Sequence, residues 1–216
     1  IVPRLVQHPA TARHLVRKLY RWLISETETP DDALLAPLAT AFTQDDDIGR
    51  LVATMLRSNL FFSERAYRRR VKSPIAFALG LVRGLEALVP TRTLSRDLAQ
   101  LGQNLGAPPT AHGWPGGTSW VNPAMVVARA NLAASLLGEA EPYGGKLDPL
   151  AVARRHGQGS DEASGPFLID LFLQGDLPAG SKRLLLESAS SAEGDAGKRL
   201  RRLVAAIATL PEYQLD

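Results

Sequence analysis

The chain has 216 residues, of which 45% are hydrophobic and 22% are charged, and its formal net charge is +3 at pH 7. This length and balance are typical of a soluble globular protein with a sizeable core. The chain contains no cysteine, which excludes a disulfide framework, thiol catalysis and thiolate metal sites. No apolar run approaches the ~20 residues that a membrane-spanning helix needs, so we expect no transmembrane segment.

The first predicted helix starts at Pro9, because proline is tolerated at the first helical position. An apolar stripe at helical spacing follows, and basic residues occupy another face of the helix. That face has two interpretations: it binds an anionic group, or it is solvated and pairs with acids elsewhere. We take His8, Arg13 and Lys18 as candidate binding residues. The members of the apolar stripe are Ala12, Leu15, Val16, Leu19, Tyr20 and Leu23.

Two further helices are predicted between residues 31 and 58. Asp31 and Asp32 start the first of them, since their charge opposes the positive end of the helix dipole. Three consecutive aspartates, residues 45–47, then precede Ile48. They lack the alternating pattern and the distal glutamate of a calcium loop. We therefore predict that they cap the next helix, which ends near Ser58.

The densest positive patch is predicted to be a short basic helix from Arg65 to Lys72, capped by Ser63 and Glu64. Only Tyr67 lies inside it, so the aromatic interleaving of a single-strand binder is missing, and no helix-turn-helix signature is present. We do not expect a nucleic-acid partner, although anion or nucleic-acid binding stays as an alternative function. The patch consists of Arg65, Arg68, Arg69, Arg70 and Lys72.

The most unusual stretch runs from Gly102 to Arg129 and holds two of the three tryptophans. Helices are predicted on its N-terminal side, from Ser73-Pro74 through Val89 and from Ser95 to Asn104. A loop of turn residues follows, and Asn122 then caps a helix that runs to Gly138. Either the loop binds a ligand, or its tryptophans fill a gap in a helical core. The candidate binding residues of this stretch are Gln103, His112, Trp114, Trp120, Asn122 and Arg129.

Four motifs in this order resemble the bacterial family of uncharacterised proteins called DUF1800. They are HPATARHLVRKLYRWL at residues 8–23, Lys72-Ser73-Pro74, LGQNLGAPPTAHGWPGGTSWVNPAMVVAR at residues 101–129, and Pro211-Glu212-Tyr213. The resemblance covers nearly the whole chain. Members are usually about twice as long, so the chain looks like the C-terminal half of one.

The resemblance implies a location and a partner but no mechanism. Members are often predicted to be exported, and they often lie beside a sulfatase-like family called DUF1501. It therefore implies an exported, periplasmic or cell-envelope protein with a DUF1501 protein as partner. The chain itself shows no signal peptide, and Ile1 is not a natural start, so we expect a fragment or a processed product.

The remainder of the chain is predicted to be a helical extension. We predict a main helical domain at 1–138 and an extension at 139–216 packed on it, or one single domain. Within the extension, 157–165 is rich in Gly and Ser and is predicted to be a mobile loop. The expected fold class is all-α: an irregular bundle of about eight to ten helices with one long loop rich in Gly, Pro and Trp.

No catalytic motif is found. The chain has no G-x-S-x-G, and residues 194–199 lack the spacing and the Ser/Thr of a phosphate-binding loop. The four histidines are not spaced for zinc, so we expect no metal site and no cofactor. We expect a helical scaffold or interaction domain that binds a partner protein. The alternative is a carbohydrate-binding or carbohydrate-active protein in which Trp114 and Trp120 stack on sugar rings, with a glycan as partner.

Overall fold

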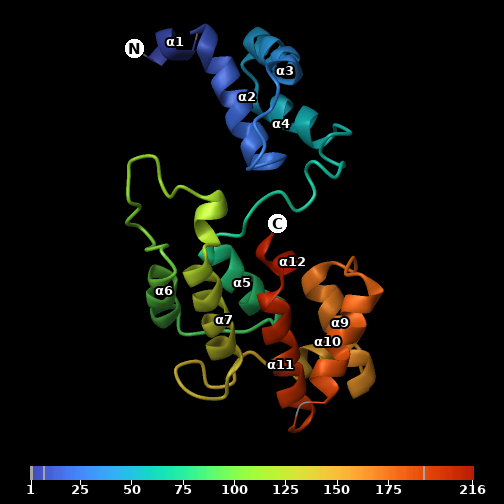
Figure 1. The fold of residues 1–216 in the computed structure, drawn as a ribbon. Coiled ribbons are helices and arrows are strands. Elements are labelled where there is room, and N and C mark those ends of the chain that lie inside the picture. The colour runs from blue at the N-terminus through green and yellow to red at the C-terminus, as the bar shows by residue number, and fades with distance from the viewer. Residues whose placement is uncertain (1, 7, 192) are drawn as a thin grey trace. The chain divides into compact units, whose positions relative to one another are not determined.

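The protein is all-α over the part of the chain that the structure describes. A computed structural model describes residues 2–6, 8–191 and 193–216, which form twelve α-helices and one short 3-10 helix without any strand (Figure 1). The predicted multi-helix fold is confirmed. Within the described residues no helix has the length and apolar character that crossing a membrane requires.

The helices fall into two compact units, residues 1–71 with 216, and residues 72–215. The first unit holds α1 (Val2–Val6), α2 (Pro9–Leu23), α3 (Asp32–Asp45) and α4 (Ile48–Leu56). The second unit holds α5 (Pro74–Gly84), α6 (Thr91–Gln100), η1 (Gly117–Trp120), α7 (Pro123–Leu137), α8 (Pro149–Arg155), α9 (Asp161–Leu173), α10 (Ala179–Ser190), α11 (Ala196–Thr209) and α12 (Pro211–Gln214). Helices on both sides of Gly138 contribute to one hydrophobic core in the second unit. The predicted domain boundary at residue 138 stays a prediction.

In the first unit, α2, α3 and α4 pack around a small apolar core. The apolar stripe of α2 faces this core, as its helical spacing predicted. Local caps define the helix starts: Asp31 accepts a hydrogen bond from the Ala33 amide and Asp47 from the Arg50 amide. The buried residues are Ala12, Val16, Tyr20, Ile24, Leu35, Ala39, Phe42, Leu51 and Met55.

The predicted basic helix from Arg65 to Lys72 was wrong. These residues form turns, and Arg68 has a positive φ of 50°, which an α-helix does not allow. The backbone groups bond elsewhere: the Arg69 carbonyl accepts from the Glu26 amide at 3.3 Å, and the Glu26 carboxylate accepts from the Val71 amide at 3.3 Å. The segment is therefore held by the residues that follow α2 instead of by its own helical hydrogen bonds.

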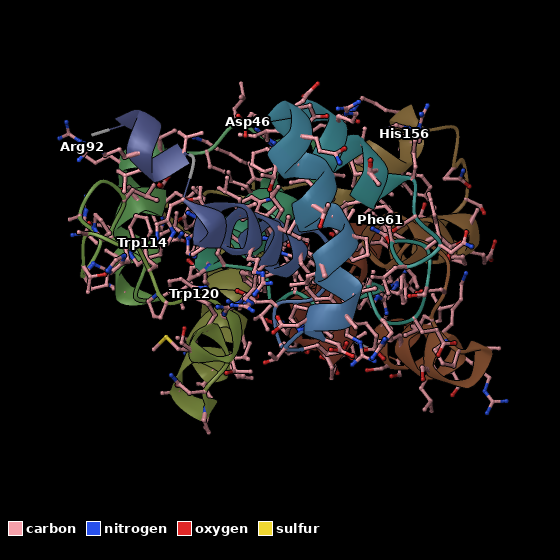
Figure 2. All side chains as sticks on the ribbon, turned by 90° about the horizontal axis from the view of Figure 1, so that it is seen from above. Asp46, Phe61, Arg92, Trp114, Trp120 and His156 are labelled. Atoms are coloured by element: carbon pink, nitrogen blue, oxygen red, sulfur yellow. The ribbon has the colours of Figure 1, made fainter. Side chains whose placement is uncertain are left out.

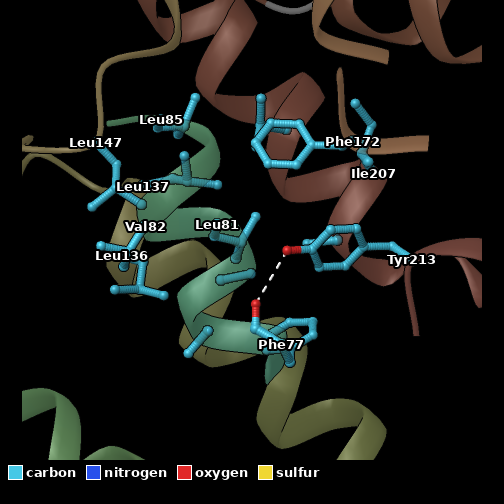
Figure 3. Packing of buried hydrophobic residues seen from close by; sticks show 14 of the residues in the cluster. Phe77, Leu81, Val82, Leu85, Leu136, Leu137, Leu147, Phe172, Ile207 and Tyr213 are labelled. Carbon is cyan, nitrogen blue, oxygen red and sulfur yellow. Dashed lines mark hydrogen bonds between the residues drawn. The ribbon is translucent and has the colours of Figure 1, made fainter. Parts of the chain in front are cut away.

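In the second unit, α7 and α11 lie side by side at the centre, with α5, α8 and α9 packed around them (Figure 1). Their facing leucines, valines and isoleucines form the core, and Tyr213 and two phenylalanines close one side (Figure 3). The Tyr213 hydroxyl donates to the Phe77 carbonyl at 3.1 Å. Two glycines of α5 make room for the rings: a Cβ would lie 2.7 Å from Tyr213 Oη at Gly80 and 2.6 Å from Phe172 Cε1 at Gly84.

Three boundary predictions in this unit were wrong. The helix expected from Ser95 to Asn104 begins at Thr91, directly after Pro90, and ends at Gln100, shortly before Gly102 with its positive φ of 85°. The helix expected to reach Val89 ends at Gly84, because Glu86 adopts a positive φ of 50° and the Ala87 amide bonds back to the Val82 carbonyl. The segment 157–165, expected to be a mobile loop, is helical from Asp161 onward. Ser160 caps α9 by accepting from the Ala163 amide at 3.2 Å, so a strong local cap outweighs the Gly/Ser composition.

Candidate functional site

The loop between α6 and α7 is exposed to solvent on the surface of the second unit. None of residues 104–119 is buried, and the segment curves away from the two helices that it joins (Figure 1). Gly113 and Gly116 adopt positive φ values of 93° and 71°, which glycine reaches without strain. The loop is therefore exposed, and the positions of its glycines fix the course of its backbone.

Buried side chains hold the loop at both ends. Gln103 is 8% exposed, and its Oε1 accepts from the Ile75 amide at 2.8 Å, which ties the end of α6 to the start of α5. Trp120 is 7% exposed, and its ring lies over Gly102, where a Cβ would sit 3.8 Å from Cζ3. The two ends of the loop are thus attached to the core close to each other, at Gln103 and Trp120.

The two tryptophans of the loop differ in burial (Figure 2). Trp120 is buried and acts as an anchor, whereas Trp114 is half-buried and His112 is exposed. The Thr110 hydroxyl accepts from the His112 amide at 3.2 Å, and Thr110 and Gly113 form an isolated bridge that closes the tip. One of the two indoles therefore remains partly accessible for contact with a ligand.

Asn122 begins α7: its Oδ1 accepts from the Met125 amide at 3.0 Å. Since this bond satisfies an otherwise unpaired helix donor, we expect Asn122→Ala to lower the free energy of unfolding by about 1 kcal/mol. Asn122→Asp is the control, because a carboxylate accepts the same bond and opposes the helix dipole. Urea denaturation of the three proteins checks this. Equal stability of the alanine variant and the wild type would contradict a capping role.

Three of the four motifs that carry the family resemblance meet in a largely buried polar cluster formed by Lys72, Arg129, Tyr213 and Gln214. Arg129 is 1% exposed, and its Nη1 donates to Gln214 Oε1 at 2.9 Å while Nη2 donates to the Lys72 carbonyl at 2.6 Å. Its guanidinium lies 5.2 Å from the Phe77 ring centroid. Burial lowers the pKa of Arg129 to about 10, so the side chain is still a cation at neutral pH.

The other members of the polar cluster complete these bonds. The Lys72 Nζ donates to the Tyr213 carbonyl at 3.0 Å and lies 4.2 Å from the centroid of the Tyr213 ring. The Lys72 amide donates to the Gln214 carbonyl at 2.8 Å, and Gln214 Nε2 donates to the Ala208 carbonyl at 2.6 Å. The polar cluster therefore joins the start of α5, the middle of α7 and the C-terminal end of the second unit.

The remaining predicted site residues lie in the first unit. His8 caps α2, with Nδ1 accepting from the Ala10 amide at 3.1 Å, and Arg13 and Lys18 are exposed. On the same helix Arg17 pairs with Asp32 at 2.9 Å, as expected for a solvated face. These residues and the loop 104–119 belong to different units.

The predicted basic patch is divided between the units. Lys72 belongs to the polar cluster, whereas Arg65, Arg68, Arg69 and Arg70 lie in the first unit. There the guanidinium of Arg70 stacks 4.7 Å from the ring centroid of Trp22, and that of Arg68 lies 5.3 Å from the centroid of Tyr67. Trp22 is 63% exposed. Sequence reasoning missed it, since it comes from α2 and no local signal links it to the arginines.

A second feature that the sequence missed is an exposed titratable cluster beside α8. Glu86 accepts from Arg155 Nε at 2.9 Å and lies 2.8 Å from His156 Nε2, and the His156 ring stacks on Phe167. The hydrogen bonds from His156 and Arg155 lower the pKa of Glu86. No group of three or more metal-binding side chains occurs among the residues that the structure describes.

These observations define an all-α protein with a largely buried polar cluster and a solvent-exposed loop in its second unit. The chain belongs to the family described as "Protein of unknown function (DUF1800)", whose family model matches residues 1–215. The family predicted from the motifs is thereby confirmed. No curated protein and no solved structure matches the chain.

Proposed function

We propose that this chain is an interaction domain, a helical scaffold that binds a partner protein through the loop 104–119. The observation that carries the proposal is the contrast between the loop and its ends: none of residues 104–119 is buried, while Gln103 and Trp120 are. A loop fixed on a rigid frame loses little conformational freedom on binding. Exposed loops on such frames commonly carry binding residues.

Trp114 and His112 are the contacts that we assign to this loop. Trp114 is half-buried, so its indole keeps a fixed position and still offers apolar surface to a partner. Tryptophan is the residue type most enriched among the dominant contacts of protein interfaces. His112 is exposed at the loop tip and adds a polar contact.

We further propose that the protein acts in the exported or cell-envelope fraction and that its partner is a protein of the sulfatase-like DUF1501 family, beside which members of this family often lie. Both statements rest on the family resemblance. Fractionation of cells that express the full-length gene tests the location. Recovery of the protein only with the cytoplasmic fraction would refute an envelope role.

The partner hypothesis is tested by direct binding between the purified chain and a purified DUF1501 protein. We expect saturable binding that Trp114→Ala weakens about thirtyfold, as for an interfacial tryptophan worth ~2 kcal/mol. The matched control is Leu88→Ala, which removes an apolar side chain that is 90% exposed elsewhere in the second unit. Equal loss in both variants, or undiminished binding by Trp114→Ala, would refute the loop as the binding surface.

A carbohydrate ligand is the second candidate, and the partial exposure of Trp114 favours it. An indole face of this kind stacks on the apolar face of a sugar ring. A glycan array with wild type and Trp114→Ala distinguishes the two candidates. Signal from one glycan class that is lost in the variant favours carbohydrate, whereas protein binding with a blank array favours the scaffold.

Anion binding by the first unit is a third candidate, and the Arg70–Trp22 and Arg68–Tyr67 stacks favour it. Arginines beside exposed aromatic rings contact both the phosphates and the bases of single-stranded nucleic acid. Such binding weakens steeply with salt. Absence of any mobility shift with single-stranded or duplex DNA at low salt would exclude nucleic acid as the anion.

A further inference from the structure

A groove of about 770 Å³ lies between α9, α10 and α11 in the second unit. Its volume falls in the range of about 300–1,000 Å³ that is usual for small-molecule sites. Apolar and small residues from all three helices line most of it. They include Gly165, Ala179, Leu186, Ala189, Leu200 and Leu203.

The groove exists because α10 leaves part of the surfaces of α9 and α11 uncovered. None of the residues of α10 is buried, although Leu185, Leu186 and Ala189 are partly buried against the core. A Cβ on Gly165 would lie 2.7 Å from Leu186 Cδ2, so α9 and α10 are already in close contact at that point. Small side chains on either side of this contact leave the remaining space open.

The charged side chains around the groove are already engaged. Lys182 Nζ lies 2.7 Å from Asp170 Oδ1, and Arg183 Nε lies 3.5 Å from Glu187 Oε1. Arg199 Nη1 donates to the Gly194 carbonyl at 2.7 Å. Glu162 is exposed at the groove and disfavours a second carboxylate. The three cations Lys182, Arg183 and Arg199 are thus balanced in formal charge by Asp170, Glu187 and Glu162, and an anionic ligand meets no net positive charge at this groove.

The groove lining also offers few free hydrogen-bond donors or acceptors. The Ser190 hydroxyl, also on the lining, donates to the Glu187 carbonyl at 2.9 Å. An extended peptide seated in this groove would bring backbone amides and carbonyls that need partners, and leaving them unpaired is costly. A hydrocarbon chain needs no such partners and gains from the apolar lining.

We propose that this groove binds an uncharged apolar chain, of the kind found in the acyl or isoprenoid part of a lipid. The proposal is independent of the loop 104–119. The probe is N-phenylnaphthylamine, an uncharged dye that fluoresces in apolar sites. Its anionic counterpart is anilinonaphthalene sulfonate, which has the same aromatic rings.

We expect N-phenylnaphthylamine to bind the full chain saturably, with one site, and the sulfonate to bind about tenfold more weakly. Dodecanol should displace the dye, whereas dodecanoate should do so about tenfold less well, because the two share a chain length and differ in charge. Equal affinity for the charged and uncharged members of either pair would overturn the charge argument. Displacement by an amphipathic helical peptide but not by dodecanol would overturn the proposal in favour of a protein ligand.

Blocking variants locate the site. Ala189→Phe places a ring inside the groove, and Ala179→Phe does so nearer the start of α10; each should weaken dye binding about tenfold or more. Ser188→Phe is the matched control, since Ser188 is exposed on the same helix and does not line the groove. Far-UV circular dichroism establishes that each variant is folded. Undiminished binding in either folded blocking variant, or equal loss in Ser188→Phe, would overturn the assignment.

The outcome is distinguishable from that of the partner experiment. Trp114→Ala should leave dye binding unchanged, and Ala189→Phe should leave binding to the partner protein unchanged. Loss of dye binding in Trp114→Ala would place the dye at the loop and overturn the groove proposal.

Discussion

Arg129→Ala is expected to lower the free energy of unfolding by about 2–4 kcal/mol. The substitution leaves two acceptors, the buried Gln214 Oε1 and the partly buried Lys72 carbonyl, without their donors. It also removes the guanidinium that packs against Phe77. Relief from burying a cation offsets part of this cost, because burial lowers the pKa of Arg129. Urea denaturation followed by circular dichroism measures the change.

A double-mutant cycle separates the contribution of the Arg129–Gln214 hydrogen bond to stability from the other effects of replacing Arg129. Arg129→Met keeps much of the volume and loses the donors, and Gln214→Leu removes one acceptor. Because both polar partners are then replaced by apolar groups, we expect the double variant to be more stable than the sum of the single changes by about 1–3 kcal/mol. Additive effects, or an Arg129→Ala variant as stable as the wild type, would contradict a structural role. They would return Arg129 to the set of binding residues.

Gly80→Ala is expected to lower the free energy of unfolding by about 1–3 kcal/mol, although helix propensity alone predicts a gain of about 1 kcal/mol. The added Cβ would lie 2.7 Å from Tyr213 Oη, a separation that forces the ring to move. Movement of the ring also disturbs the hydrogen bond from the Tyr213 hydroxyl to the Phe77 carbonyl. A lower free energy of unfolding for Gly80→Ala therefore shows that packing against Tyr213 outweighs helix propensity, and a higher one shows the reverse.

Two controls accompany this experiment. In a Tyr213→Phe background the obstructing oxygen is gone and the nearest ring atom, Cζ, is 3.6 Å from the new Cβ, so Gly80→Ala should cost little. Gly180→Ala in α10 meets nothing within 4 Å and should raise stability by up to about 1 kcal/mol. If Gly80→Ala also stabilises the protein, the close packing of α5 against Tyr213 is incorrect.

Features that depend on local sequence were predictable. His8, Asp31, Asp47 and Asn122 cap the helices that follow them, because a cap needs only an acceptor and the next two or three amides. The exposed loop was predictable for a similar reason, since its glycines and prolines exclude any long helix. In residues 65–72, where the arginines, the alanine and the lysine favour a helix, the contact with Glu26 outweighed that intrinsic preference and the helix prediction failed.

Features that depend on distant partners were not predictable. Arg129 lies on α7 among candidate contacts of the loop, and nothing near it in the sequence indicates burial. Its acceptors come from Lys72 and Gln214, on opposite ends of the second unit's sequence. The Arg70–Trp22 stack has the same character. Only the three-dimensional contacts show which of these positions form the core and which remain accessible.

The fixed ends of the loop also determine how freely its length can change. Gln103 and Trp120 carry the attachment to the core, and no buried side chain lies between them. The chain entropy lost on closing a flexible loop rises by only about 0.6 kcal/mol for each doubling of its length. Insertions between residues 104 and 119 therefore cost little in the free energy of folding. Selection for recognition can reshape this segment in length as well as in sequence while the helical frame stays the same.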